Sequence, residues 1–547
     1  MTYGGTKTRS TEKVTKRQGV GSGFSRTDSE GLIMSAIDTQ PVVLDGQHLT
    51  IDDIVRVARD LAPVELAPAA RDRIQRCRAF VEKRTAAGAV MYGINTGIGE
   101  LSEVVLAPDQ IRAFQRYLVY SHAAGCGEPL PIEVVRAAMC SRVNVLAKGH
   151  SGPRLLIVDT LVRMLNRGVT PVVFDKGSVG ACGDLSPMSQ MAIVLLGEGE
   201  AFFDGRRLPG ADAMRAAGVP TVEFEARDGL ATINGSNMTA GFGALELHDA
   251  DRFYKTAEVA AALTLEVLNA NMAAYDERIH TVRGFPGAVT SAANVRRLTA
   301  GSEMLAQKGK KVQDAYSLRS TPQVVGTAKD AWKWARQMFE VELNGVGDNP
   351  IFFPDEETYL TGANFQGSPL GVPLDTLGSC VTMIAVLSER RTNRLLNRNL
   401  SAGLPAFLTK GAGMFSGLML TQYTQGMLIC EDRILSAPAS VGSIPAAADQ
   451  EDFVSMSFTA ALKTRQILDN AWYVLAIELM AAAQAVEFRP PLGLGAGTAA
   501  AYRVIREHVA PLVEDRPLQY DINRLTAVVR SGVLLDAVES AVGPLES

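Results

Sequence analysis

Cysteine pairs, a basic excess and long hydrophobic runs are all missing from this 547-residue chain. Its net charge is −5, which argues against a nucleic-acid partner because such proteins normally present a basic face. The cysteines are scattered, with no Cys-x-x-Cys pair, so we expect neither a disulfide framework nor a metal site. They are Cys77, Cys126, Cys140, Cys182, Cys380 and Cys430.

No uninterrupted apolar run reaches the roughly 18 residues of a membrane-spanning helix. Residues 1–38 are rich in Ser, Thr, Gly, Lys and Arg and lack the apolar core of a secretory signal. We therefore expect a disordered N-terminal tail, a cytoplasmic location and no membrane partner.

Long stretches without Gly or Pro occupy residues 244–283, 379–402 and 451–489. Ala, Leu, Met and Glu dominate them, which favours helix. Within the last stretch, residues 471–488 are apolar on nearly every face, so this helix is expected to be buried on all sides. The pattern predicts a mainly α protein with a long central helical bundle.

Segments rich in Gly and Pro separate the predicted helices, and reactive groups are often carried on such loops. The catalytic loops are therefore expected at one end of the bundle. We predict two regions after the tail: 39–240, which carries the first loops, and 241–547, which holds the long-helix bundle and the C-terminal helices. The loops fall at 92–100, 177–187, 234–237, 345–350 and 362–367.

The tripeptide Ala181-Cys182-Gly183 can close on itself if the fold compresses it. The Gly183 nitrogen attacks the Ala181 carbonyl, and loss of water gives an imidazolone ring. Loss of the β substituent of Cys182 then leaves a methylidene group, an electrophile that no standard side chain supplies. Gly183 is needed because a Cβ would obstruct the attack. A thiol, with a pKa of about 8.5, is a reasonable leaving group.

The surrounding residues 177–187, Gly-Ser-Val-Gly-Ala-Cys-Gly-Asp-Leu-Ser-Pro, resemble the signature of the histidine and aromatic amino-acid ammonia-lyases. In that family Ala-Ser-Gly forms the methylidene-imidazolone cofactor, MIO, and Cys182 here replaces the serine. The resemblance implies an MIO formed autocatalytically from Ala181, Cys182 and Gly183. It also implies the helical fold of the histidase and phenylalanine ammonia-lyase type and a homotetramer with active sites shared between subunits.

Two further segments resemble the family. Residues 91–99, Met-Tyr-Gly-Ile-Asn-Thr-Gly-Ile-Gly, are similar to its mobile inner loop, which implies that Tyr92 removes the β proton of the substrate. Residues 313–319, Gln-Asp-Ala-Tyr-Ser-Leu-Arg, imply that Arg319 holds the substrate carboxylate as a bidentate fork, with Tyr316 lining the cofactor and Gln313 in the substrate site. Without the other motifs, the plainer interpretation of Tyr92 is a tyrosine packed on the surface of a turn. The plainer interpretation of Arg319 is an arginine in a structural ion pair.

Two shorter matches place polar and aromatic groups near the cofactor. Asn234, in Asn234-Gly235, is implied to contact the cofactor or the substrate amine, although an isolated Asn-Gly is usually a plain turn. In the match at residues 362–365, Phe365 is implied to pack beside the cofactor, with Asn364 nearby.

The substrate is predicted from Glu451 and His122. The segment Gln450-Glu451-Asp452 resembles the histidine-specific version, and a carboxylate suits an imidazole better than a bare phenyl ring. His122 lies where the family selects the substrate ring, or is a structural histidine on a helix. Phe453 departs from the histidine usual in histidine-specific members. We expect L-histidine and the product urocanate; the alternatives are a phenylalanine or tyrosine lyase, an aminomutase, and a silent scaffold with an uncyclised Cys182.

Overall fold

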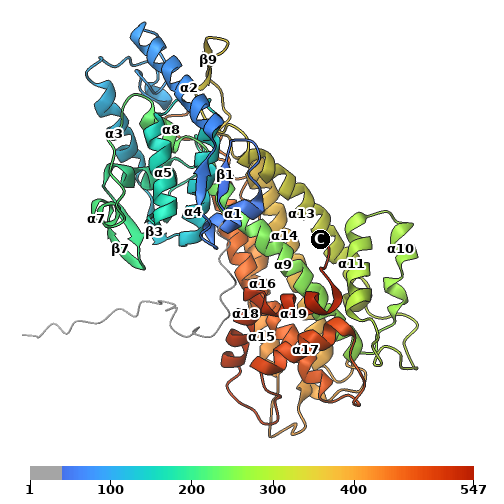
Figure 1. The fold of residues 1–547 in the computed structure, drawn as a ribbon. Helices are drawn as coiled ribbons and strands as arrows, with labels where there is room; N and C mark the ends of the chain where they lie inside the picture. The colour runs from blue at the N-terminus through green and yellow to red at the C-terminus, as the bar shows by residue number, and fades with distance from the viewer. Residues whose placement is uncertain (1–39) are drawn as a thin grey trace, which may run out of the picture. The chain divides into compact units, whose positions relative to one another are not determined.

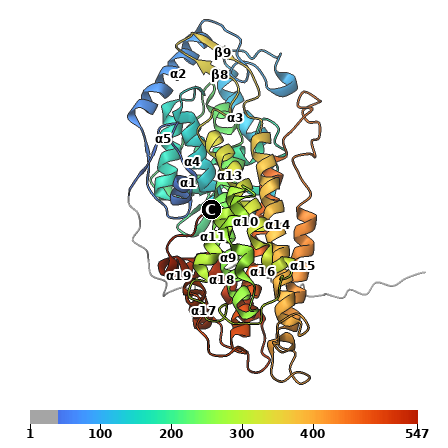
Figure 2. The same cartoon turned by 90° about the vertical axis from the view of Figure 1, so that its right-hand side faces the viewer.

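The computed structural model describes residues 40–547, and the tail predicted at 1–38 lies outside them. Long helices dominate these residues, and the predicted mainly α class is confirmed. Four helices lie side by side as the central bundle (Figures 1 and 2). They are α9 (Asn237–Val267), α13 (Thr321–Leu343), α14 (Ser368–Leu396) and α16 (Ser457–Val486).

Helix α16 is buried on nearly every face, as its apolar sequence predicts. Its Trp472 packs edge-on against Phe253 of α9, with the ring centroids 5.2 Å apart. Helix α14 is the one helix among the described residues that is long and apolar enough to cross a membrane. Within its apolar window, 61% of the residues are buried inside the protein, so this surface belongs to the bundle core.

The boundaries of α9 differ from the prediction at both ends. The stretch 244–283 is not one helix, because α9 ends at Val267 and Asn269 adopts a left-handed φ of 49°. The side chain of Asn271 then caps a new turn by accepting a hydrogen bond from the Ala273 amide, a local bond that competes with helix continuation. At its start α9 includes Gly241, where a Cβ would collide with the Ala138 backbone nitrogen of a neighbouring helix.

Smaller elements precede the bundle or, in the case of β8 and β9, connect two of its helices. Helices before α9 are α1 (Ile51–Ala58), α2 (Pro68–Ala86), η1 (Gly99–Leu101), α3 (Ile111–His122), α4 (Ile132–Ala147), α5 (Leu155–Arg167), α6 (Leu185–Ala192), η2 (Ile193–Leu196), α7 (Gly210–Ala216) and α8 (Asp228–Ile233). The strands are β1 (Val42–Leu44), β2 (Val64–Leu66), β3 (Cys126–Pro129), β4 (Thr170–Pro171), β5 (Phe174–Lys176), β6 (Glu200–Phe203), β7 (Arg206–Pro209), β8 (Ile351–Phe353) and β9 (Thr358–Leu360).

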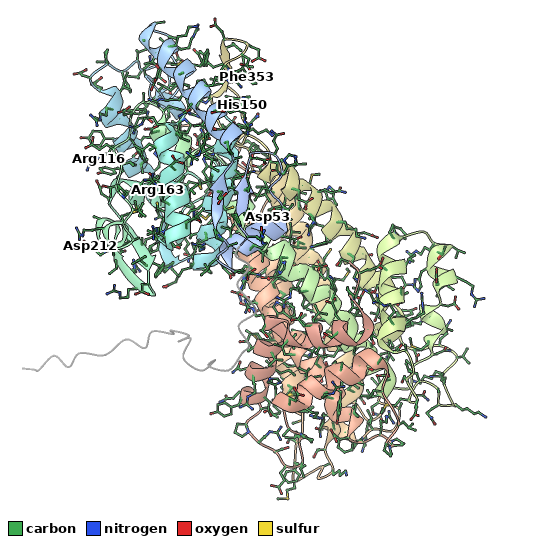
Figure 3. The ribbon with its side chains drawn as sticks, viewed as in Figure 1. Asp53, Arg116, His150, Arg163, Asp212 and Phe353 are labelled. Carbon is green, nitrogen blue, oxygen red and sulfur yellow. The ribbon has the colours of Figure 1, made fainter. Side chains whose placement is uncertain are left out.

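These strands form small sheets. β1 pairs with β2 in parallel, with Val42 opposite Val64, whereas β3–β5, β4–β6–β7 and β8–β9 are antiparallel. The β8 strand is tied to the N-terminal region by His150, whose ring lies beside Phe353 with the centroids 5.5 Å apart (Figure 3).

Helices packed around the far part of the bundle complete the fold (α17–α19 are red in Figure 1). They are η3 (Met272–Tyr275), α10 (Glu277–Thr281), α11 (Pro286–Leu298), α12 (Tyr316–Arg319), η4 (Ala406–Leu408), α15 (Met419–Leu435), α17 (Ala496–His508), α18 (Gln519–Ser531) and α19 (Val533–Val542). Residues Thr39–Ser547 form one compact unit. The proposed division at residue 240 stays a prediction, and α9 runs across it.

Candidate active site

The predicted tripeptide lies in a sharply bent loop between β5 and α6. Cys182 has a φ of 53° and Gly183 a φ of 80°, both in the left-handed region. That conformation costs a non-glycine residue about 1–2 kcal/mol, so the loop is strained at Cys182. A Cβ on Gly183 would collide with the backbone of Gly235. The bend and the glycine are the two features that ring closure across this tripeptide requires.

Hydrogen bonds fix the loop to the start of the bundle. The Gly235 amide donates to the Cys182 carbonyl at 3.2 Å, and the Asp184 amide donates to the Gly235 carbonyl at 2.9 Å. The buried Asp184 carboxyl also accepts a hydrogen bond of 2.8 Å from the Thr239 amide in the first turn of α9. Burial raises the pKa of Asp184 to about 6, although hydrogen bonds from Thr239 and Ser178 oppose the rise.

The Cys182 thiol contacts a carboxylate. Its Sγ donates a hydrogen bond to Glu451 Oε1 at 3.1 Å. Burial raises the pKa of Cys182, and Glu451 raises it further. The segment that carries Glu451 is fixed beside the loop, because the Met456 amide donates to the Val179 carbonyl at 3.0 Å. A thiol and a carboxylate far apart in sequence therefore meet directly.

Tyr92 belongs to the same group of side chains. Its hydroxyl accepts a hydrogen bond of 3.1 Å from the Gly99 amide, and a Cβ on Gly99 would lie 3.8 Å from Glu451 Oε1. Burial is the main cause that raises the pKa of Tyr92 to about 12, and electrostatic interaction with Cys182 and Glu451 adds to the rise. A base with this pKa needs an added positive charge to work near neutral pH.

Asn234 and Phe365 belong to segments that are linked to the loop through Gly235 and Ser236. Asn234 is 1% exposed, and its Nδ2 donates to the Asn349 carbonyl at 3.1 Å. Its Oδ1 is buried without a hydrogen-bond partner, which is unusual for a polar atom inside a protein. The Phe365 carbonyl accepts a hydrogen bond of 2.9 Å from Ser236 Oγ, which joins its loop to the Asn234 segment, and Asn364 is exposed.

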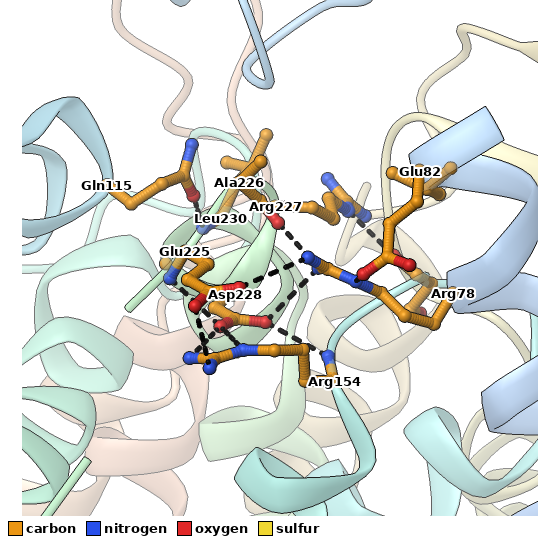
Figure 4. Close-up of polar contacts among 12 residues, drawn as sticks. Arg78, Glu82, Gln115, Arg154, Glu225, Ala226, Arg227, Asp228 and Leu230 are labelled. Carbon is orange, nitrogen blue, oxygen red and sulfur yellow. Dashed lines mark hydrogen bonds and ion pairs between the residues drawn. The ribbon is translucent and has the colours of Figure 1, made fainter. Parts of the chain in front are cut away.

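Helix α8 and the Tyr92 loop are held by polar residues that carry no motif. Asp228 accepts hydrogen bonds from the Arg154 amide at 3.0 Å and from Arg154 Nε at 2.6 Å (Figure 4). Gln115 is fully buried: it accepts from the Leu230 amide at 3.2 Å and donates to the Gly93 carbonyl at 3.0 Å. No local pattern in the sequence marks these residues, and only the fold brings them together.

A second supporting cluster is ionic. Asp348 lies between Arg142 and Arg227, at 3.3 and 2.8 Å, and all three side chains are fully buried. Arg142 also donates to Asn237 Oδ1 at 3.0 Å, and Arg227 donates to the Asn349 carbonyl at 3.1 Å. The segment at residues 345–350, predicted as a loop of the site, is thereby fixed behind Asn234. The sequence indicated the segment without indicating its arginine partners.

A second group of predicted site residues lies apart from the Cys182 loop and consists of Gln313, Tyr316 and Arg319. The Arg319 guanidinium stacks 4.8 Å from the centre of the Tyr316 ring, which is 73% exposed. Arg319 and Gln313 line a cavity of about 520 Å³ near η3 and α12, and neither the Cys182 loop nor Tyr92 contributes to its lining. Arg319 Nε is buried without a partner. Within one chain, the predicted site residues therefore form two separate groups.

His122 ends α3, and its contacts are local. Its Nδ1 lies 2.8 Å from the Leu118 carbonyl oxygen and 3.0 Å from Ser121 Oγ. A few residues later, Gly125 packs closely against Gly177 at the start of the tripeptide loop. The segment that follows His122 therefore reaches the loop, and the role of His122 in selecting the substrate ring stays a prediction.

Comparisons with known proteins identify the family of this chain. The model of the aromatic amino acid lyase family matches residues 49–507. The chain is 47% identical over 492 residues to a histidine ammonia-lyase of Caldanaerobacter subterraneus subsp. tengcongensis, covering 90% of this chain and 97% of that protein. Among solved structures, it resembles a tyrosine aminomutase from Streptomyces globisporus, with a TM-score of 0.89 and 35% identity over 93% of this chain and 100% of the other.

Histidine ammonia-lyase from Trypanosoma cruzi is similar at a TM-score of 0.85 and 35% identity, covering 92% of this chain and 96% of that one. The fold, the bent loop and these relatives define an enzyme of the ammonia-lyase class, which breaks a carbon–nitrogen bond. The chain belongs to the aromatic amino acid lyase family. The resemblance that the sequence motifs indicated is confirmed.

Proposed function

We propose that this enzyme eliminates ammonia from L-histidine and releases urocanate, using an MIO formed from Ala181, Cys182 and Gly183. The observation that carries the proposal is the 3.1 Å contact between Cys182 Sγ and Glu451 Oε1. It puts a carboxylate beside the carbon that becomes electrophilic, where it can pair with an imidazole or an ammonium group. The relatives named histidine ammonia-lyase support this substrate.

The residues around the loop fit an MIO. The ring would flatten the α carbon of Cys182 and so relieve its left-handed strain. Asn234 Oδ1 is a buried acceptor without a partner beside the loop. Gly183 leaves no space for a side chain against Gly235. When formed, an MIO supplies an electrophilic methylidene carbon that turns the substrate nitrogen into a better leaving group.

The side chains of this enzyme perform the remaining work. Tyr92, oriented by the Gly99 amide, is the base that removes the β proton. Arg319 holds the substrate carboxylate as a fork, and Gln313 and Tyr316 lie on the same segment. Asn234, Asn364 and Phe365 line the cofactor side of the pocket.

The Tyr92 group and the Arg319 group come together, in our proposal, in a homotetramer whose active sites are shared between subunits. Arg319 and Tyr92 lie in different parts of one chain, so one subunit supplies the carboxylate fork to the base of another. The arriving guanidinium also provides the positive charge that favours the ionised form of Tyr92. A cytoplasmic location and a role in amino acid catabolism complete the proposal as predictions.

An aminomutase is the second candidate, because the tyrosine aminomutase structure resembles the chain at a TM-score of 0.89. Such an enzyme would return the ammonia to the β carbon. Analysis of the amine products by chromatography separates the two: free ammonia with urocanate supports the lyase, and a β-amino acid supports the aminomutase. An ultraviolet time course with L-histidine, L-phenylalanine and L-tyrosine offered separately tests the substrate, and the acrylate absorbance should rise fastest with L-histidine.

A further inference from the structure

The sulfur that has to leave during cofactor formation is the atom that Glu451 contacts. The segment that carries Glu451 has two backbone links: Glu451 pairs with Ala446 in an antiparallel bridge, and the Met456 amide bonds to the Val179 carbonyl just before the tripeptide. The first link forms a local turn at Glu451, and the second joins this segment to the Cys182 loop. Its position matters before any substrate arrives.

Cofactor formation needs no oxidant. The Gly183 nitrogen bonds to the Ala181 carbonyl carbon, whose oxygen leaves as water with the hydrogens of the Gly183 and Cys182 amide nitrogens. A base then takes the α proton of Cys182, the electron pair forms the Cα=Cβ bond, and the Cβ–S bond breaks. The sulfur departs with the bonding pair as hydrosulfide, which a proton converts to hydrogen sulfide. The net loss is one water and one hydrogen sulfide.

We propose that Glu451 restrains the departure of the Cys182 sulfur, so that the carboxylate placed for the substrate also sets the rate at which the cofactor forms. The inference rests on the proposed function, because it concerns the same ring. Negative charge develops on sulfur 3.1 Å from a carboxylate in a part-buried site, where repulsion between like charges is less screened than in open water.

The hydrogen bond adds to this repulsion. By accepting the S–H hydrogen, the carboxylate stabilises the neutral thiol that precedes bond breaking. The pKa of the Cys182 thiol rises for the same reasons, since burial and then Glu451 both disfavour charge on the sulfur. A neutral amide at position 451 would remove the repulsion and could donate an N–H to the departing sulfur.

The experiment follows maturation of the full-length chain after cell-free synthesis. Translation is stopped, and the mass of the tryptic peptide 177–206 is then measured at intervals by mass spectrometry. Released sulfide is measured in parallel with a fluorogenic probe. The variants are wild type, Glu451→Gln, Glu451→Ala and Cys182→Ser. Asp452→Asn is the matched control, because Asp452 is the adjacent carboxylate and is exposed. Loss of the carboxylate should speed maturation severalfold, because the departing sulfur no longer faces a like charge.

Each result decides the matter. Faster loss of water and sulfide in both Glu451 variants, with Asp452→Asn at the wild-type rate, supports the inference, and either Glu451 variant suffices if the other does not fold. Equal or slower loss of water and sulfide without the carboxylate, or equal acceleration in Asp452→Asn, overturns the inference. The proposal that an MIO forms still stands in that case. No mass loss in wild type and Glu451 variants overturns the proposed cofactor together with the inference. Cys182→Ser should lose two waters and no sulfide.

Discussion

Gln115 donates a hydrogen bond to the Gly93 carbonyl and accepts one from the Leu230 amide, so one buried amide joins the Tyr92 loop to α8, the helix that ends just before Asn234. Gln115→Leu would leave two buried backbone groups unpaired, at about 1–3 kcal/mol each. We expect a lower unfolding temperature and reduced turnover, with maturation of the Cys182 loop intact by mass. Gln47→Leu, at an exposed glutamine, is the control; an equal effect there would contradict this role.

The proposed sharing of the active site between subunits predicts complementation between two inactive variants. Tyr92→Phe removes the proposed base and Arg319→Ala the proposed carboxylate fork, and each alone should lose most activity. Co-expressed, they should regain part of it, because a mixed tetramer contains some sites with both native residues. Activity of purified mixed tetramers, compared with each variant alone, measures this. No regain in tetramers shown by native mass spectrometry to be mixed would mean that one chain supplies both residues.

The pKa of Asp184 predicts a pH dependence of stability. Burial raises it from 3.8 to about 6 in the fold, so its contribution is fully present below pH 3.8 and is lost as pH rises through about 6. The loss is about 3 kcal/mol, from roughly two pKa units. The wild-type unfolding free energy, measured against that of Asp184→Asn, should therefore fall between pH 4 and 6. A difference that stays constant or grows across this range would contradict the assignment.

Sequence motifs predicted the loop at Ala181–Gly183 and the neighbours Tyr92, Asn234 and Glu451, because each belongs to a contiguous pattern with recognisable chemistry. Gln115 and Asp348 could not be predicted, since each is an isolated polar residue whose partners lie far away in sequence. Their function exists only after folding, when burial makes an unpaired polar group costly.

The ends of the long helices could not be predicted from the sequence either. The absence of Gly and Pro predicted a helix through residues 244–283, but side-chain capping by Asn271 ended it earlier. Conversely, α14 contains Pro373 and α9 contains Gly241, because tertiary packing outweighs weak local propensity. In the proposed tetramer Arg319 reaches Tyr92 of another subunit, a relationship that no linear pattern encodes.

Glu451 should distinguish substrates in the mature enzyme. Glu451→Gln removes the charge that pairs with an imidazole, so kcat/KM for L-histidine should fall by much more than kcat/KM for L-phenylalanine. Steady-state rates are normalised to the fraction of chains with a mature loop, measured by mass, because the same change is expected to alter maturation. Equal losses for both substrates would remove the argument for histidine.

The central claim is that Cys182 yields a working electrophile for L-histidine. The most direct measurement is urocanate absorbance with L-histidine and purified wild type, beside Cys182→Ala, with the intact mass of each protein recorded first. The account predicts a wild-type mass lower by one water and one hydrogen sulfide, a rising absorbance, and neither effect in Cys182→Ala. An unchanged wild-type mass with a flat trace, or equal turnover by Cys182→Ala, would contradict it.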